Sequence, residues 1–235
     1  MNLKIKSIEV HRNAIRILNN VSLFLEEGER ISIIGSNGVG KTTLLNTISG
    51  ILHPTAGEIT FCDLRIDELE PHKIAELGVM HVPEKGRVFP LMTVRENLEM
   101  GVYIKEARKK KAESFEMVYQ LFPVLGQKRR QIASSLSGGE QRMLAIARTL
   151  VGCPKVLMLD EISSGLAPKI IEEIFEKLMV KRKTELAILI VEQDIKRALK
   201  FSDRGYVMVT GAIKAEGRSE DLLKDDFLKQ AYLGL

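Results

Sequence analysis

Residues 31–42 read ISIIGSNGVGKT, and this stretch decides the fold of the chain. An apolar segment predicted as a strand, Glu29–Ile34, runs into a glycine-rich loop, and the loop opens a helix predicted over Lys41–Ser49. Glycines in such a loop let backbone N–H groups close around a phosphate, and the N-terminus of the helix adds partial positive charge. The stretch therefore predicts an α/β fold with a phosphate-binding loop.

Two side chains of this phosphate loop have specific expected roles. Lys41 is expected to bridge the β- and γ-phosphates of a nucleotide, and the hydroxyl of Thr42 to bind Mg²⁺. The alternative, an ordinary glycine turn, does not account for the strand before the loop and the helix after it. The residues expected to bind the nucleotide here are Gly35, Ser36, Asn37, Gly38, Val39, Gly40, Lys41, Thr42 and Thr43.

A second segment, Val156-Leu157-Met158-Leu159-Asp160-Glu161, ends an apolar strand in two adjacent carboxylates. Ligands of open α/β sheets bind at the edge where the strands end. Asp160 is therefore expected to hold the hydration shell of Mg²⁺, and Glu161 to orient or deprotonate an attacking water. A strand that ends in acidic residues is common, so this assignment depends on the phosphate loop.

The hexamer Leu136-Ser137-Gly138-Gly139-Glu140-Gln141 predicts a second anion site. Its serine and glycines open a helix predicted over Glu140–Val151, where free backbone N–H groups and the helix dipole attract an anion. An N-capped helix after a serine–glycine turn explains Ser137 but not the whole hexamer. Because the chain already has one phosphate loop, the second site is expected to serve the ATP of another chain. The residues expected there are Ser137, Gly138, Gly139 and Glu140.

Strands and helices alternate along much of the remaining chain. Residues 93–150 break this alternation, because they are helical and richly charged with no convincing strand. We therefore expect a mostly parallel α/β core sheet, interrupted by a helical subdomain near residues 90–150. The other predicted strands are Leu3–Val10, Val21–Leu25, Glu58–Phe61, Val79–Val82, Ala187–Val191 and Tyr206–Thr210, and the other predicted helices are Pro71–Leu77, Pro168–Lys181 and Ile195–Phe201.

The composition is that of a globular protein, with 45% hydrophobic and 28% charged residues. The longest apolar run, Leu186–Val191, is far shorter than the roughly 20 residues that cross a bilayer. Cys62 and Cys153 are too few for a disulfide framework or a zinc site. We expect both to be small buried side chains in a reducing cytosol.

Three basic clusters accompany the net charge of +4. Their simplest interpretation is a set of solvated helix faces and ends, and the alternative is a contact with an anionic membrane surface or partner. Nucleic acid is the least favoured partner, because no aromatic side chains interleave with the basic ones. The clusters are Arg108–Lys111, Lys128–Arg130 and Lys181–Lys183.

With these motifs in this order, the full chain resembles the ATP-binding subunits of ABC transporters. The resemblance is closest to the subunits that drive branched-chain amino-acid importers, although related amide and urea importers share much of the same sequence pattern. The segments that carry the narrower resemblance are His81–Glu84, Phe89–Gly101, Gly165–Pro168, Val191–Gln193 and Ala231–Gly234.

The resemblance implies a single ABC ATPase domain over residues 1–235, of the P-loop NTPase fold, with an antiparallel β part at the N-terminus. Its catalytic core would cover about residues 1–90 and 151–235, and its helical subdomain about residues 91–150. The implied partners are a second ATP-binding subunit (another copy or a paralogue), membrane permease subunits and a separate solute-binding protein. ATP would lie between the phosphate loop of one subunit and the hexamer of the other, at the cytoplasmic face of the membrane. The region Glu84–Pro90 would couple nucleotide to permease, with Phe89 as a candidate permease contact.

Four positions depart from the common pattern of this family. Glu84 replaces an amide near Mg²⁺, so it either adds negative charge near the metal or is a solvated loop acid. Gln193 replaces a histidine that senses the γ-phosphate, and it can hydrogen-bond that phosphate without titrating. Ile162 replaces a proline, which predicts a looser turn Ser163-Ser164-Gly165 along the dimer seam and puts the hydrolysis rate in doubt more than ATP binding. Arg12 replaces an aromatic residue at the adenine, where its guanidinium either stacks on the base or stays exposed.

A soluble ABC ATPase that acts on ribosomes or DNA is the alternative from another functional class. DNA-maintenance members of the family need a long coiled-coil insertion between the phosphate loop and the hexamer. Members that act in translation usually carry two ATPase cassettes in one chain. This sequence has neither feature, so an importer subunit is favoured.

Overall fold

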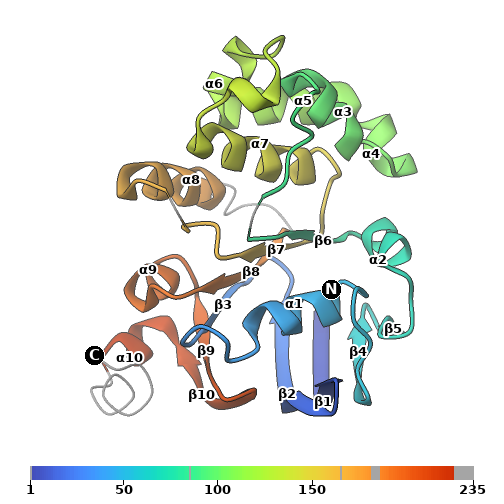
Figure 1. Cartoon of the computed structure of the whole chain (residues 1–235), viewed down its shortest axis with the longest axis vertical. Coiled ribbons are helices and arrows are strands. Elements are labelled where there is room, and N and C mark those ends of the chain that lie inside the picture. The colour runs from blue at the N-terminus through green and yellow to red at the C-terminus, as the bar shows by residue number, and fades with distance from the viewer. Residues whose placement is uncertain (1, 85, 165, 181–185, 225–235) are drawn as a thin grey trace.

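The computed structural model describes residues 2–84, 86–164, 166–180 and 186–224. Figure 1 shows two sheets in the lower part of the molecule and a group of helices at the top. That group contains α3 (Val94–Gly101), α4 (Lys105–Lys109), α5 (Lys111–Leu121), α6 (Pro123–Gln127) and α7 (Gly138–Leu150). Residues 93–150 thus contain helices and one isolated bridge between Thr93 and Ile132, but no strand, as predicted.

The N-terminal sheet is antiparallel and has the strand order β2-β1-β4-β5. Its strands are β1 (Asn2–Arg12), β2 (Ile15–Glu26), β4 (Ala56–Phe61) and β5 (Leu64–Arg65). The first two are much longer than predicted, because they form one hairpin around Asn13 and Ala14, both of which have positive φ. The two-residue strand β5 was not predicted, since it is too short to show any alternation.

The second sheet has the order β10-β9-β3-β8-β7-β6 and is parallel except for the β9–β10 pair. Every residue of its three central strands is buried, which explains why they read as unbroken apolar runs. The strands are β3 (Arg30–Ile34), β6 (Val79–Val82), β7 (Val156–Asp160), β8 (Ala187–Glu192), β9 (Arg204–Val209) and β10 (Ala212–Arg218). Strand β10 was missed in the prediction, because it is half exposed and polar.

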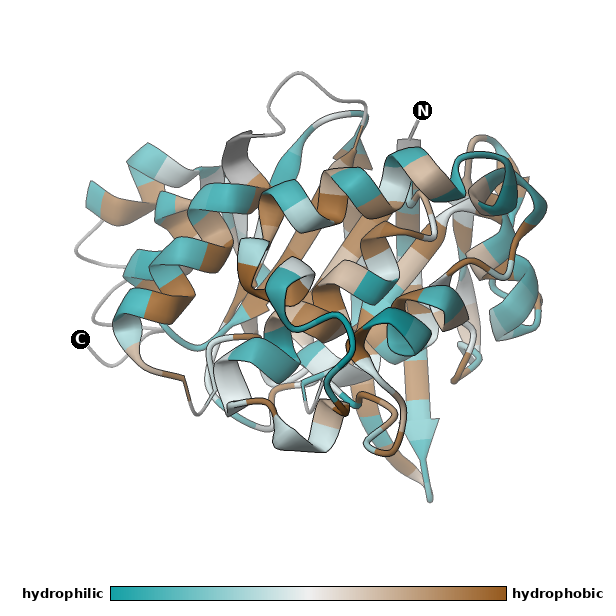
Figure 2. Ribbon diagram, turned by 90° about the horizontal axis from the view of Figure 1, so that it is seen from above, coloured by the Kyte–Doolittle hydropathy of each residue, from teal (hydrophilic) through white to brown (hydrophobic). Residues whose placement is uncertain are grey.

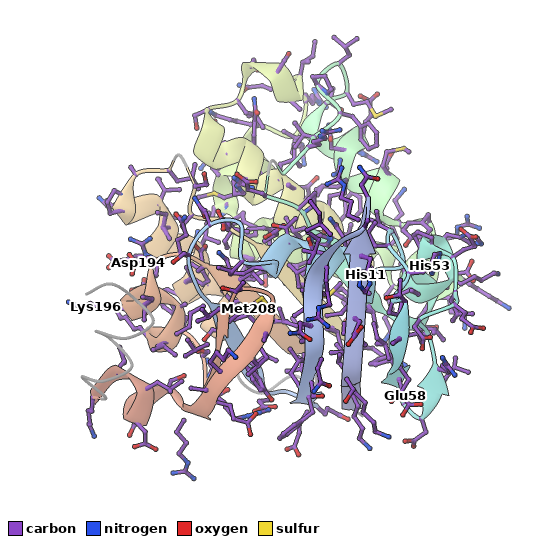
Figure 3. The ribbon with its side chains drawn as sticks, turned by 60° about the horizontal axis from the view of Figure 1, so that its bottom comes forward. His11, His53, Glu58, Asp194, Lys196 and Met208 are labelled. Carbon is purple, nitrogen blue, oxygen red and sulfur yellow. The ribbon has the colours of Figure 1, made fainter. Side chains whose placement is uncertain are left out.

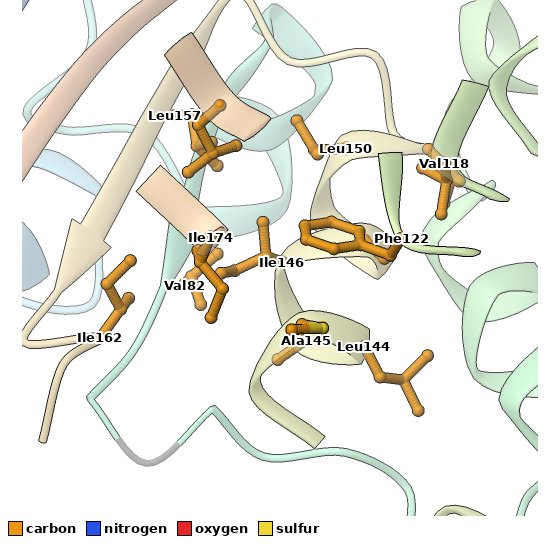
Figure 4. Close-up of a cluster of buried hydrophobic side chains, with 14 of the residues drawn as sticks. Val82, Val118, Phe122, Leu144, Ala145, Ile146, Leu150, Leu157, Ile162 and Ile174 are labelled. Atoms are coloured by element: carbon orange, nitrogen blue, oxygen red, sulfur yellow. The ribbon is translucent and has the colours of Figure 1, made fainter. Parts of the chain in front are cut away.

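Helices cover the sheets and leave a hydrophobic core between the layers. In Figure 2 the strands are largely hydrophobic, while the helices carry both hydrophilic and hydrophobic faces. The close-up in Figure 4 shows how the upper layer is attached: Ile146 and Leu150 of α7 pack with Val82, Leu157 and Ile174. The remaining helices are α1 (Lys41–Ile48), α2 (Pro71–Leu77), α8 (Pro168–Val180), α9 (Ile195–Lys200) and α10 (Ser219–Lys224).

Some predictions about individual residues were wrong. Cys62 is exposed in the turn between β4 and β5, and Cys153 is only half buried, beside the hydroxyl of Ser114. Helix α7 begins at Gly138, two residues before its predicted start, because Ser137 caps it.

The basic cluster Lys181–Lys183 and the segment Ala231–Gly234 lie outside the described residues. Within the described part of the chain, no helix combines the length and the apolar character needed to cross a membrane.

Candidate nucleotide-binding and hydrolysis site

The phosphate loop joins β3 to α1 in a conformation that requires glycine. Gly40 is the N-cap of α1 and has φ of 110°, a left-handed value that other residues rarely adopt. At Gly35, an added Cβ would lie 2.3 Å from the carbonyl oxygen of Met208, which Figure 3 marks on β9. Ser36–Gly38 are exposed between these two points. The loop is therefore held in a glycine-dependent conformation with its middle residues open to solvent, where a phosphate can reach it.

Lys41 is buried beneath this loop. Its Nζ donates hydrogen bonds to the carbonyl oxygens of Gly35 at 2.8 Å and Ser36 at 3.0 Å. The same nitrogen lies 3.3 Å from Oε1 of Glu161, at the end of β7. One lysine thus connects the phosphate loop to the predicted catalytic carboxylate.

Asp160 ends β7 directly below the start of α1. The hydroxyl of Thr42 donates to its Oδ1 at 3.2 Å, and the residue is fully buried. Burial raises the pKa of Asp160 from 3.8 to about 6, against the hydrogen bond from Thr42, which lowers it. A hydroxyl and a carboxylate side by side are the oxygen ligands that Mg²⁺ takes from a protein when phosphates and waters complete its shell.

The described residues hold no group of three or more His, Cys, Asp or Glu side chains that makes a metal cage by itself. Asp160 Oδ2 is nevertheless buried without a hydrogen-bond partner. A carboxylate kept in this state is destabilised unless a cation or a donor compensates it. The donor set therefore fits a divalent ion that is held jointly with a nucleotide.

Glu161 adopts a strained backbone conformation. Its φ is 42°, which is uncommon for a residue other than glycine, and its N–H donates to the carbonyl of Val191 at 2.9 Å. Such strain often accompanies a functional position, where the surrounding structure enforces it. The enforcing contacts here come from the next residues.

Side-chain contacts hold the start of the turn after Glu161, where the missing proline predicts a looser turn. Ile162 is 1% exposed and belongs to the large core cluster (Figure 4). The N–H and the hydroxyl of Ser163 both donate to the carboxylate of the buried Glu192, at 3.1 and 2.6 Å. Side-chain packing and these hydrogen bonds restrain Ile162–Ser163 in place of a fixed proline φ; Gly165 lies outside the described residues.

Helix α7 contacts the loop that contains Glu84. Arg142 donates to the backbone carbonyl of Glu84, and its guanidinium lies within 3.5 Å of the carbonyl oxygens of Pro83 and Ser164. The charge of Glu84 also raises the pKa of Asp160, which places that carboxylate within electrostatic range of the metal ligand. Glu84 is therefore close to the site. Among the described residues, no hydrogen bond joins its side chain to Thr42 or Asp160.

The hexamer forms a capped helix start in the upper layer. Ser137 Oγ accepts from the N–H of Glu140 at 3.3 Å, and the Glu140 carboxylate accepts from the N–H of Ser137 at 3.0 Å, a complete capping box. Lys128 neutralises Glu140 at 2.7 Å. The pKa of Glu140 is lowered overall, because these hydrogen bonds outweigh the raising effect of burial.

This helix start borders a hollow of about 420 Å³, which Ser137, Gly138 and Gly139 line together with Leu166 and Ile170. The polar contacts of Ser137 and Gln141 are with Ala133, Leu136 and Glu140, all in the upper layer. The hollow and the phosphate loop have no lining residue in common. The structure therefore brings Lys41, Thr42, Asp160 and Glu161 together, and no hydrogen bond or ion pair among the described residues joins the hexamer to them.

The remaining predicted residues lie at the margins. Gln193 is exposed just after β8 and before Asp194, which Figure 3 marks at the start of α9. Arg12 is exposed at the tip of the β1–β2 hairpin, opposite Ile15 and next to the labelled His11. Neither residue contacts the cluster around Asp160 through a hydrogen bond or ion pair described in this structure.

Sequence reasoning missed three residues that the structure adds to the site: His81, Arg142 and Glu192. Nε2 of His81 is buried and lies 4.0 Å from Oδ2 of Asp160. Burial lowers the pKa of His81 to about 4. The available signal for His81 was its place in a predicted strand, Val79–Val82. The strand that ends in Asp160 was predicted as well, but the sequence did not give the register that pairs the two strands.

Comparison with known proteins identifies relatives along the whole chain. Residues 18–164 match the profile of the family described as ABC transporter. The chain is 38% identical, over 99% of each sequence, to the high-affinity branched-chain amino acid transport ATP-binding protein BraG of Pseudomonas aeruginosa. It also matches the ADP conformation of MJ1267, an ATP-binding cassette of an ABC transporter, with a TM-score of 0.86 and 30% identity over 100% of both chains. The dimeric ATP-binding cassette MJ0796 with ADP and Pi matches with a TM-score of 0.77 and 27% identity, over 92% of this chain and 98% of that one.

Proposed function

Because the chain belongs to the ABC transporter family, we propose that it is the ATP-binding and ATP-hydrolysing subunit of an importer for branched-chain amino acids. The observation that carries this proposal is the contact between the phosphate loop and the acidic end of β7: Lys41 with Glu161, and Thr42 with Asp160. BraG, which is named as a branched-chain amino acid transport protein, supports the choice of solute. The chain would work at the cytoplasmic face of the membrane, held there by a permease.

The phosphate loop binds the triphosphate of ATP in this proposal. Its backbone N–H groups and the start of α1 hold the β-phosphate, with Gly35–Thr43 forming the cradle. Thr42 and Asp160 would hold Mg²⁺, and Glu84 would add negative charge near it. Bound Mg²⁺ would neutralise charge on the β- and γ-phosphates during hydrolysis. Arg12, exposed at the hairpin tip, would stack its guanidinium on the base.

Binding of the γ-phosphate changes the partner of Lys41. Nζ now points to two carbonyl oxygens and to Glu161, and a phosphate of greater negative charge attracts it away from them. Glu161 is then free to orient and deprotonate the attacking water. Gln193 donates its amide N–H to the γ-phosphate. ATP binding itself thus prepares the catalytic carboxylate.

A second ATP-binding subunit completes the site. With Ser137 and Glu140 engaged in their own capping box, the free donors at the start of α7 are the N–H groups of Gly138 and Gly139. These face a hollow away from the chain's own phosphate loop, so they serve the nucleotide of a partner cassette. The dimeric MJ0796 structure supports such a pairing. The partner is either another copy of this chain or a paralogue.

The permease binds in a groove of about 450 Å³ between the lower body and the helical layer. The groove is lined by the half-exposed apolar side chains of Ile51, Phe89, Met100 and Tyr103, which is unusual for a surface without a partner. Arg148 lies with its guanidinium 4.9 Å from the ring of Phe89, and its Nη1 has no hydrogen-bond partner among the described residues. A short permease helix with apolar side chains and a hydrogen-bond acceptor for Arg148 fits this groove.

The test is affinity purification of the tagged chain from membranes of its source cells, followed by identification of the proteins retained. We expect permease subunits with several membrane spans, and we expect Phe89→Ser to lose them. Leu64→Ser, an equally exposed apolar position on β5, is the matched control and should retain them. Recovery of ribosomes or DNA-bound complexes in place of permeases would refute the proposal. Uptake of labelled leucine against a labelled amide then decides the solute.

A further inference from the structure

Two unpaired polar atoms face each other in the interior of the site. Three buried side-chain nitrogen or oxygen atoms of the described residues lack a hydrogen-bond partner, and two of them are His81 Nε2 and Asp160 Oδ2. These two atoms lie 4.0 Å apart, on side chains that are 8% and 1% exposed. Buried polar atoms are nearly always paired, because an unpaired one destabilises the fold. A donor and an acceptor left unpaired at this distance indicate a contact that closes in another state of the protein.

The sheet register places these residues together. Strands β6 and β7 are parallel neighbours, with His81 opposite Met158. Asp160 lies two residues beyond Met158, and residues two apart on a strand share a face. His81 and Asp160 are therefore on the same side of the sheet at its carboxyl edge, where their relative position is fixed by backbone hydrogen bonds.

The two oxygens of Asp160 have different surroundings. Oδ1 accepts from the hydroxyl of Thr42 and is on the side of the phosphate loop. Oδ2 is on the buried side, toward His81. Thr42 and Oδ1 would hold a metal ion together, which leaves Oδ2 for a partner from the protein.

His81 is suited to be that partner. A neutral imidazole has one N–H donor, which either ring nitrogen can carry. Placing the proton on Nε2 pairs it with the carboxylate oxygen. A decrease of about 1 Å in the present separation gives a normal hydrogen bond.

We propose that His81 is a positioning residue for Asp160: its Nε2–H donates to Oδ2 when Asp160 binds Mg²⁺, and this bond fixes the carboxylate with Oδ1 toward the metal. The inference rests on the proposed ATPase function. Outer hydrogen bonds of this kind commonly orient a metal-binding carboxylate and increase its affinity for the ion. His81 itself touches neither nucleotide nor metal.

The experiment measures metal and nucleotide binding separately on the purified chain. Mn²⁺ replaces Mg²⁺, and free Mn²⁺ is followed by electron paramagnetic resonance at saturating ATP. ATP affinity without metal is measured in EDTA with a fluorescent ATP analogue. His81→Leu and His81→Met remove the donor and should weaken Mn²⁺ binding about 10- to 100-fold while ATP binding in EDTA is unchanged. His81→Gln and His81→Asn retain an N–H donor, and at least one should recover most of the affinity.

His72→Leu is the matched control, because His72 is exposed on α2 away from the site, and it should bind Mn²⁺ like the parent. The inference is overturned if the Leu and Met variants keep the parental Mn²⁺ affinity, or if neither amide variant recovers any of it. A parent chain that binds neither ATP nor Mn²⁺ would instead contradict the proposed function. If the parent binds both ATP and Mn²⁺ and the Leu and Met variants bind them equally well, only the role proposed for His81 is refuted, and the proposed function stands.

Discussion

Asp160→Asn is expected to stabilise the chain in the absence of nucleotide and metal. Burial raises the pKa of Asp160 from 3.8 to about 6, so the ionised carboxylate is unfavourable in the folded state. At about 1.4 kcal/mol for each pKa unit, ionisation of this group lowers the free energy of unfolding by about 3 kcal/mol. An asparagine still accepts the hydrogen bond from Thr42 but carries no charge. For a chain of this size we expect a rise in Tm of roughly 6–12 °C at about pH 8.

The pH dependence of this gain follows from the direction of the pKa change. A folded-state pKa above the unfolded value means that the folded parent binds the proton more tightly. The parent therefore equals the variant at a pH below 3.8, loses stability relative to it as the pH rises through about 6, and stays less stable above that. His81 has the opposite effect, because its pKa falls from 6.5 to about 4, but it is present in both proteins.

Thermal unfolding in EDTA at several pH values checks this prediction, with Asp67→Asn as the control. Asp67 is also buried, but hydrogen bonds from Arg65 and from the N–H of Ile59 outweigh burial and lower its pKa. Asp67→Asn should therefore destabilise the chain at neutral pH, and its effect should fade as the pH falls and the parental carboxylate is protonated. The reasoning is refuted if Asp160→Asn melts at or below the parent at about pH 8, or if its gain is the same at every pH.

Three further substitutions test the proposed chemistry and the turn beside it. Glu161→Gln should retain ATP and accumulate as a dimer in size-exclusion chromatography, and hydrolysis at the parental rate would show that Glu161 does not position the water. Ser137→Arg should abolish dimer-dependent hydrolysis while the monomer still binds ATP; loss of ATP binding by the monomer would contradict a role in trans. Ile162→Ala should lower the free energy of unfolding by about 2–5 kcal/mol in urea denaturation, because Ile162 is a fully buried anchor. A loss well under 1 kcal/mol would mean that packing of Ile162 does not hold the turn.

Local signals in the sequence predicted the residues around the phosphates. The loop Gly35–Thr42 and the strand that ends in Asp160 and Glu161 each carry their own pattern, and the structure brings them together through Lys41 and Thr42. The helical layer was predicted in the same way, from a long charged stretch without alternation. The assignment of catalytic and metal-binding roles stays a prediction.

Wrong predictions arose where a residue depends on distant parts of the chain. Cys62 was expected inside because cysteine is usually buried, but it falls in a tight turn at the surface. The loss of a proline at Ile162 predicts a looser turn, and the sequence did not show that the core cluster and Glu192 contact the start of this turn. The surface position of Cys62 and the contacts of Ile162 and Ser163 depend on how distant segments pack, so the order of residues does not show them.

The sequence by itself determined a glycine-rich loop between a strand and a helix, a strand that ends in two acidic residues and a serine-capped helix start, because each depends on residues close together in the chain. The tertiary structure alone decided that His81 faces Asp160, that Arg142 connects α7 to the Glu84 loop, and that the hexamer lies apart from the chain's own phosphate loop. These relations depend on strand register and on packing between layers, which join segments far apart in sequence. Their physical basis is the set of backbone hydrogen bonds between β6 and β7 and the apolar core beneath α7.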